Sequence, residues 1–93
     1  MAIQVLQTPL FARQKKKLNK KQIKFLDKAV TLIFENPTVG EQKKGNLNSI
    51  WVYKFKITDQ LYLLAYEWDK KSRVLIALGV HENFYRDLKK YLK

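Results

Sequence analysis

The sequence predicts an α+β fold in a single domain over residues 1–93. We expect a short N-terminal strand and a helical hairpin packed on an antiparallel β-sheet meander, with a C-terminal helix. Apolar residues recur every three or four positions early in the chain and every second position in its middle, which indicates helices followed by strands. The chain is 46% hydrophobic, enough for one compact core, and its length excludes a two-domain enzyme.

The first elements expected are a strand and a short helix. Ile3, Val5 and Leu6 form a short apolar stretch typical of an edge strand. Thr8 and Pro9 then favour a helix start, because threonine can cap free N–H groups and proline at the first helical position loses no hydrogen bond. This helix should run to about Lys17.

A second helix is expected over residues 20–34. Asn19 is suited to cap its start, and Asn36 before Pro37 ends it, because a residue before proline avoids the helical conformation. Residues 37–48 include two glycines and are expected to form a loop. The apolar positions of the helix fall on one face: Ile23, Leu26, Ala29, Val30, Ile33 and Phe34.

The hydrophobic period then changes to two. Residues 61–68 and 73–80 are apolar on both faces and predict strands that are covered on both sides. Short turns at 58–60 and 69–72 make an antiparallel meander of these strands with the one before them. That earlier strand is half-buried, with alternating apolar residues Trp51, Tyr53, Phe55 and Ile57. Residues 83–93 should form a helix with apolar positions Phe84, Leu88, Tyr91 and Leu92.

The composition favours an anionic partner. Nineteen Lys plus Arg against eight Asp plus Glu give a net charge of +11, which suits nucleic acid, an anionic membrane surface or an acidic protein. With no cysteine and one histidine, neither a disulfide nor a structural zinc site can form, and we expect no metal and no cofactor. No segment resembles a signal peptide or is long enough to span a bilayer, so a cytoplasmic location is expected.

A run of positive charges with no acid between them points to phosphate binding. Clustered cations bind nucleic acid by releasing its counterions, whereas the structural alternative is a solvated helix face. Two further lysines, Lys43 and Lys44, lie in the expected loop. The run consists of Arg13, Lys15, Lys16, Lys17, Lys20, Lys21 and Lys24.

Two smaller groups of residues are candidates for chemistry. Lys54 and Lys56 lie two apart on a strand and share a face, which suits a phosphate clamp or, alternatively, the protection of an edge strand. His81 is the only histidine and follows a buried strand, close to Tyr85 and Arg86. A histidine can give or take a proton near neutral pH, although a lone histidine can also be an ordinary surface residue.

The order of elements resembles the RelE/ParE superfamily of bacterial type II toxins. Asn36-Pro37, a glycine-containing loop and the strand Tyr53–Lys56 are similar to a loop and strand of RelE. Tyr62–Tyr66 is similar to its next strand, and Leu78–Tyr85 is similar to its closing strand and tail. The stretch HENFYRDL resembles YafQ- and HigB-like members, and the resemblance covers nearly the whole chain.

This resemblance implies a RelE-like fold and a toxin that binds the ribosomal A site and cuts mRNA there. A cognate antitoxin, acidic and partly helical, would hold it inactive. The cleavage needs no metal: a 2′-hydroxyl attacks the adjacent phosphate and the 5′-oxygen leaves. The roles carried over are phosphate stabilisation or base catalysis for Lys54 and Lys56, general acid for His81, and base stacking or orientation for Tyr85. Arg86 has no firm counterpart but lies close enough in sequence to contact phosphate.

One position departs from the RelE pattern. Leu63 stands where RelE has an arginine, and a leucine cannot stabilise a phosphate charge. Either Lys54, Lys56 and Arg86 take that role, or the activity is weaker or absent, and the identity of the general base stays open. Two other functions also stay open: a ParE-like toxin that poisons DNA gyrase, and a non-catalytic basic module that binds nucleic acid or protein. The apolar faces of residues 61–68 and 73–80 are covered either by the antitoxin or by the chain's own helices.

Overall fold

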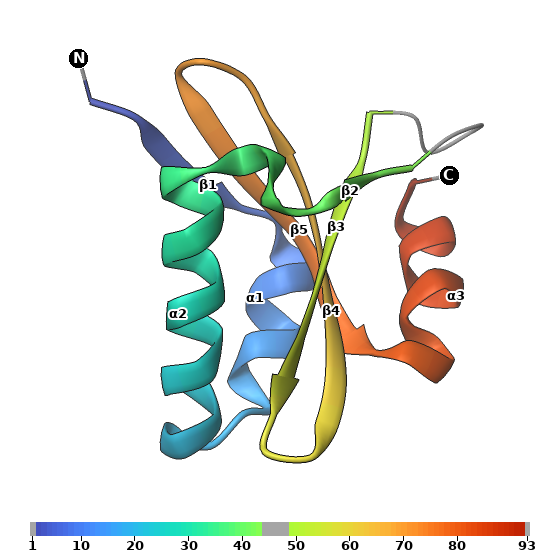
Figure 1. Ribbon diagram of the computed structural model, residues 1–93. Helices are drawn as coiled ribbons and strands as arrows, with labels where there is room; N and C mark the ends of the chain where they lie inside the picture. Colours follow the sequence, from blue (N-terminus) through green and yellow to red (C-terminus); the bar gives the residue numbers. More distant parts are fainter. Residues whose placement is uncertain (1, 44–48, 93) are drawn as a thin grey trace.

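The computed structural model describes residues 2–43 and 49–92, apart from the side chain of Leu92. Within them, one mixed sheet lies between a pair of helices on one side and a single helix on the other (Figure 1). This is the α+β architecture that the sequence predicts, with one parallel strand pair added to the antiparallel meander.

The helical hairpin begins and ends where capping chemistry places it. Strand β1 (Gln4–Gln7) leads into α1 (Pro9–Lys16), and α2 (Lys20–Glu35) follows. The Phe11 N–H donates to Thr8 Oγ1 at 3.1 Å at the start of α1. At the start of α2, Asn19 and the residue three positions on form a reciprocal capping box. Both predicted caps are confirmed.

The segment after α2 is more ordered than a plain loop. A short 3₁₀ turn, η1 (Pro37–Val39), precedes the two-residue strand β2 (Glu41–Gln42). The loop prediction for residues 37–48 is therefore wrong at β2, and residues 44–48 lie outside the described part of the chain. The Tyr66 hydroxyl donates to the Pro37 carbonyl at 2.6 Å and accepts from the Gly40 N–H at 3.0 Å, which ties this segment to the sheet.

The meander is confirmed as β3 (Trp51–Ile57), β4 (Gln60–Trp68) and β5 (Ser72–Val80), with antiparallel pairing throughout. The sheet order is β1-β5-β4-β3-β2. β1 lies at one edge, parallel to β5, and β2 lies at the other edge, antiparallel to β3.

The last helix, α3 (His81–Leu92), starts two residues before the predicted position. Neither glycine nor proline separates it from β5, and Glu82 in its first turn suits the positive end of the helix dipole. His81 is thus the first residue of a helix rather than part of a loop.

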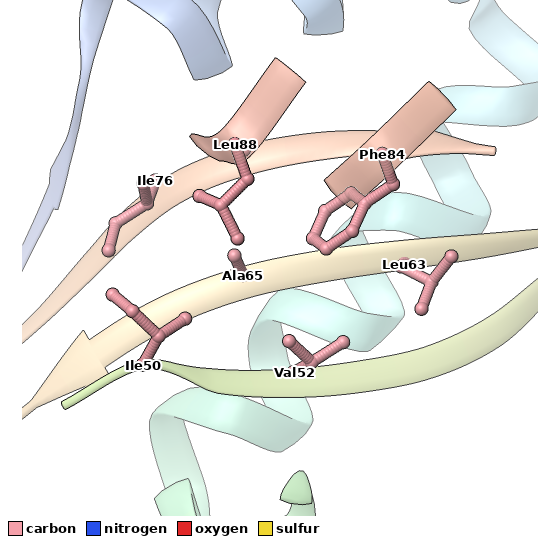
Figure 2. Close-up of a cluster of buried hydrophobic side chains, with 8 residues drawn as sticks. Ile50, Val52, Leu63, Ala65, Ile76, Phe84 and Leu88 are labelled. Atoms are coloured by element: carbon pink, nitrogen blue, oxygen red, sulfur yellow. The ribbon is translucent and has the colours of Figure 1, made fainter. Parts of the chain in front are cut away.

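Each face of the central strands is covered by the chain's own helices. Figure 2 shows Phe84 and Leu88 of α3 reaching down onto β3, β4 and β5. The α1–α2 hairpin covers the opposite face with a second cluster of buried side chains: Phe11, Leu26, Ile33, Leu64, Tyr66, Leu75 and Leu78. No antitoxin is needed to bury these strand faces, which settles the alternative that the sequence left open.

A buried arginine joins the end of α2 to the turn between β4 and β5. Arg73 is 6% exposed, and its Nε and Nη2 atoms both donate to the Phe34 carbonyl, at 3.3 and 3.2 Å. Its Nη1 atom donates to the carbonyls of Asp69 and Ser72, at 2.7 and 3.0 Å. The guanidinium therefore donates to the Phe34 carbonyl in the last turn of α2 and to two carbonyls of the turn, one of which, that of Ser72, also accepts from the Asp69 N–H.

Candidate functional site

A hollow of about 470 Å³ opens beside the start of α3, on the face of the sheet that α3 covers. We call it the His81 hollow. It brings together a lysine from β3, the start of β4 and the junction between β5 and α3. Its lining residues are Lys54, Gln60, Leu61, Val80, His81 and Glu82.

The strand register explains why Lys54 reaches this hollow. Lys54 pairs with Leu63 and Lys56 pairs with Leu61, so both lysines project on the α3 side. α3 packs over Leu63 through Phe84 but leaves both lysines exposed. Lys54 lines the hollow, and Lys56 lies two residues farther along β3, toward the turn into β4.

His81 is placed by the direct passage from strand to helix. β5 ends at Val80 and α3 begins at the next residue, so the imidazole is held at a helix start packed on the sheet. The rings of His81 and Tyr85, one helical turn apart, meet edge to face with centroids 6.1 Å apart. Tyr85 in turn meets Phe84 edge to face at 5.1 Å, and it packs against the buried cluster under α3.

A second hollow of about 450 Å³ adjoins the first through Lys54. We call it the Glu41 hollow, and its lining residues are Val39, Gly40, Glu41, Val52, Tyr53 and Lys54. Lys54 is the residue that lines both hollows. The two hollows together make a shallow surface that could take an extended anionic strand.

A second cation, Lys43, lies beside Glu41 and Tyr85, although it lines neither hollow itself. Lys43 Nζ lies 5.5 Å from the centroid of the Tyr85 ring and 3.3 Å from Glu41 Oε1. A side-chain hydrogen bond with Tyr85, followed by smaller electrostatic effects that include Glu41, raises the pKa of Lys43 above its ordinary value of 10.5. Lys43 therefore stays charged throughout the physiological pH range.

Comparison with known proteins decides the family. The profile of the ParE-like toxin of type II bacterial toxin–antitoxin systems matches residues 5–89. The chain belongs to this family. The RelE/ParE resemblance of the sequence motifs is thereby confirmed, and toxins of this class pair with a cognate antitoxin.

Solved toxin structures share the fold. The free form of an Escherichia coli RelE mutant matches with a TM-score of 0.74 and 21% identity, covering 100% of both chains. The YoeB/ParE toxin of Agrobacterium tumefaciens matches with a TM-score of 0.63 and 13% identity over 85% of this chain and 99% of that one. YafQ of E. coli gives 0.55 and 16% over 84% and 92%. No curated protein matches the sequence significantly.

Some of the site residues predicted from the sequence lie away from the His81 hollow. The Arg86 side chain is 63% exposed and meets Asp87 on its own helix at 3.5 Å, and Arg86 lines neither hollow. The positive run from Arg13 to Lys24 lies on α1, α2 and the loop between them, on the other side of the sheet (Figure 1). Lys44 falls outside the described residues.

The positive run still approaches the site at one end. Lys17 lines a hollow of about 260 Å³ that lies between the helical hairpin and α3 and includes Asn83 and Asp87. Val80 lines both this hollow and the His81 hollow, from the end of β5. Lys17 therefore places one cation of the run beside the face of α3 that carries Asn83 and Asp87.

The structure adds residues that the sequence did not single out for chemistry. Glu41 lines the Glu41 hollow, and Gln60 and Glu82 line the His81 hollow. Glu41 faces α3 because it pairs with Val52, a pairing that only the strand β2 makes visible. The sequence feature that could have pointed to Glu41 is its spacing of two from Lys43. In a strand, this spacing puts both side chains on one face.

Leu63 shows what β4 can contribute to the site. It is completely buried beneath Phe84, in the cluster of Figure 2. Its neighbours on the same face of β4 are Leu61 and Ala65, so this strand brings no cation to the two hollows. In the described residues, no cluster of His, Cys, Asp and Glu could hold a metal ion, and no helix is long and apolar enough to cross a membrane.

Proposed function

We propose that this toxin is a metal-independent endoribonuclease that cuts mRNA in the ribosomal A site and so inhibits translation. One observation carries the proposal: Lys54 and His81, from elements distant in sequence, line the same hollow. A cation beside an imidazole can supply two of the things that RNA cleavage needs, namely stabilisation of the phosphate charge and transfer of a proton. The sequence motifs that resemble RelE- and YafQ-like toxins support the same reading.

The chemistry begins with the ribose 2′-hydroxyl of the substrate. Its oxygen attacks the adjacent phosphorus, the bond from phosphorus to the 5′-oxygen breaks, and a 2′,3′-cyclic phosphate and a 5′-hydroxyl result. One proton leaves the 2′-oxygen and one must reach the departing 5′-oxygen. The crowded phosphate gains negative charge in the transition state, so positioned cations lower the barrier.

The side chains around the His81 hollow match these needs. Lys54 stabilises the phosphate, and Lys56 extends the cationic edge along β3. A protonated His81 delivers the proton to the 5′-oxygen. Tyr85 contacts the His81 ring and thereby orients it, and it also offers an aromatic surface to a base. Either strand lysine is the candidate for the general base.

The cationic surface of α1 and α2 fits the ribosomal setting. All its residues except Lys15 are exposed, and in the described part of the chain none of them is in an ion pair. Such a surface attracts rRNA phosphates without reading their sequence. The same net charge of +11 makes an acidic, partly helical antitoxin the complementary partner.

The test is expression in growing bacteria followed by primer extension on an abundant mRNA. The wild-type toxin should arrest growth and create new 5′ ends inside translated codons. His81→Gln should slow cleavage on purified ribosomes by about 10²- to 10⁴-fold, the range for loss of a general acid. Lys54→Met should slow it by about 10²-fold or more.

Lys70→Met is the matched control, because Lys70 is exposed in the turn between β4 and β5 and lines neither hollow. It should retain wild-type activity, while circular dichroism and antitoxin binding confirm that all variants fold. The family name favours one rival function, gyrase poisoning. Growth arrest with DNA-damage signalling and intact mRNA would establish that rival. No arrest would leave a binding module.

A further inference from the structure

The position of Lys43 is set by the sheet even though it follows the last residue of β2. Its N–H donates to the Ile50 carbonyl at 2.8 Å, so the backbone still pairs with the chain that leads into β3. Its side chain extends toward α3 and is only 22% exposed, whereas that of Glu41 is 75% exposed. Lys43 is thus the more buried member of this ion pair and Glu41 the more exposed one.

The contacts of Lys43 link the Glu41 hollow to the His81 hollow through Tyr85, so that the residues involved form a ring. Lys54 shares one hollow with Glu41 and the other with His81. Glu41 pairs with Lys43, which lies against Tyr85, and Tyr85 meets His81. Since β4 contributes no cation between them, Lys43 and Lys54 are the lysines that contact or share a hollow with these residues in the described part of the chain.

We propose that Lys43 binds a phosphate of the RNA strand and that Glu41 occupies its ammonium group until the RNA arrives. This rests on the proposed function in one respect, namely that RNA enters the two hollows. An exposed carboxylate gains little from such a pair, so a phosphate that meets Lys43 and Lys54 together can displace it. The Tyr85 ring keeps the ammonium in place during the exchange by a cation–π contact.

The two members of the ion pair then have opposite effects on RNA binding. Lys43→Gln removes a phosphate contact, so it should weaken binding and reduce the slope of log K against log salt by about 0.7, the value for one phosphate of a single strand. Lys43→Arg should keep the wild-type affinity and the wild-type salt slope. Glu41→Gln should tighten binding, because the competing carboxylate is gone.

The experiment is fluorescence anisotropy with a single-stranded RNA oligonucleotide in which 2′-deoxy sugars prevent cleavage, titrated over a range of NaCl concentrations. Lys70→Gln, in the turn between β4 and β5, is the control for loss of one charge. The double variant Glu41→Gln/Lys43→Gln isolates the coupling between the two residues. If Glu41 acts through Lys43, the tightening by Glu41→Gln should vanish in the double variant.

Several results would overturn the inference. One is a Lys43→Gln variant with the affinity and salt slope of Lys70→Gln. Another is a Glu41→Gln effect of equal size with and without Lys43, which would show only a general effect of charge. A wild-type toxin that does not bind the oligonucleotide overturns it too. Cleavage on ribosomes is measured separately, so a toxin that binds but does not cut refutes the proposed function alone.

Discussion

Gly40 is the residue whose side chain is most tightly limited by its neighbours. A Cβ atom there would lie 2.5 Å from the Tyr66 hydroxyl oxygen and 2.9 Å from the Val52 carbonyl oxygen. Tyr66 is completely buried, and its hydroxyl bridges Gly40 and Pro37, so the ring has no room to withdraw. Glycine is needed here for close approach of the backbone to a side chain.

Gly40→Ala should therefore lower the free energy of unfolding by about 1–3 kcal/mol, as overpacking does in well-packed interiors. Gly79→Ala is the matched control, because the nearest atoms to its added carbon would be those of Phe84 at 4.0 Å. Urea denaturation of both variants measures the difference. Equal stability of the two would mean that the contact around Tyr66 relaxes freely.

Arg73 connects the end of α2 to the turn between β4 and β5 by donating hydrogen bonds to three carbonyl groups. Arg73→Met removes the charge and takes the side-chain donor from all three carbonyls, of which only that of Ser72 keeps another partner among the described residues, the Asp69 N–H. It should therefore lower the free energy of unfolding by about 2 kcal/mol or more. Arg73→Lys should be no better, because an ammonium cannot reproduce the planar fork. Thermal unfolding measures both, and a fully stable lysine variant would contradict this account.

At the scale of elements, the turn between β4 and β5 depends on one carboxylate. Asp69 Oδ1 accepts from the Lys71 N–H at 2.7 Å and from the N–H and hydroxyl of Ser72 at 2.8 and 3.1 Å. The hydrogen bond from Lys71, followed by those from Ser72, lowers the pKa of Asp69 below its ordinary value of 3.8. The turn thus favours the ionised form.

A lowered pKa stabilises the folded state only where the carboxyl is ionised. The contribution of Asp69 should be fully present above its ordinary pKa of 3.8 and be lost as the pH falls through the lower value of the folded state. Asp69→Ala should accordingly reduce stability at neutral pH and weaken the loss of stability in acid. Urea unfolding from neutral pH to below pH 3 tests this, with Asp59→Ala in the turn between β3 and β4 as the control; identical acid profiles would refute it.

The elements also show which parts of the fold follow from local sequence. Thr8 and Asn19 cap their helices through atoms three residues away, and Pro37 stops α2, so these boundaries were predictable. β2 was not, because Glu41 and Gln42 have no apolar alternation and form a strand only by pairing with β3. The early start of α3 depends on Phe84 packing on the sheet, a contact distant in sequence.

The sequence could indicate which residues are candidates for the site, but not how they are arranged in space. Charge and strand period pointed to Lys54, and uniqueness pointed to His81, but only the register and the position of α3 bring them to one hollow. Arg86 was chosen because it is near His81 in sequence, yet its side chain points to solvent and Asp87. Sequence distance misleads on a helix, where residues one turn apart are neighbours and adjacent ones diverge.

At the scale of the whole molecule, the net charge affects stability. A net charge of +11 on 93 residues acts against the compact state through self-repulsion, and few ion pairs among the described residues offset it. Salt screens this repulsion, with a Debye length of about 30 Å at 0.01 M and about 8 Å at 0.15 M.

The free toxin should therefore melt at a higher temperature as NaCl rises over this range. Calorimetry of the toxin alone measures the effect, and the complex with an acidic antitoxin, where the charges are compensated, should show it weakly or in reverse. A melting temperature of the free toxin that falls with salt would show that local ion pairs outweigh the repulsion between like charges.

The parallel pairing of β1 with β5 has a consequence for how the chain reaches its folded state. Gln4 lies beside Ser72, and the Thr8 hydroxyl donates to the Ile76 carbonyl across 68 positions of sequence. During synthesis, the first strand must wait unpaired until nearly all the sheet has been made. Closing so long a loop early is entropically unfavourable, so this contact forms late and slows folding. A growing chain therefore lacks the pairing of β1 with β5, the strand that ends at the candidate site, until β5 has been synthesised.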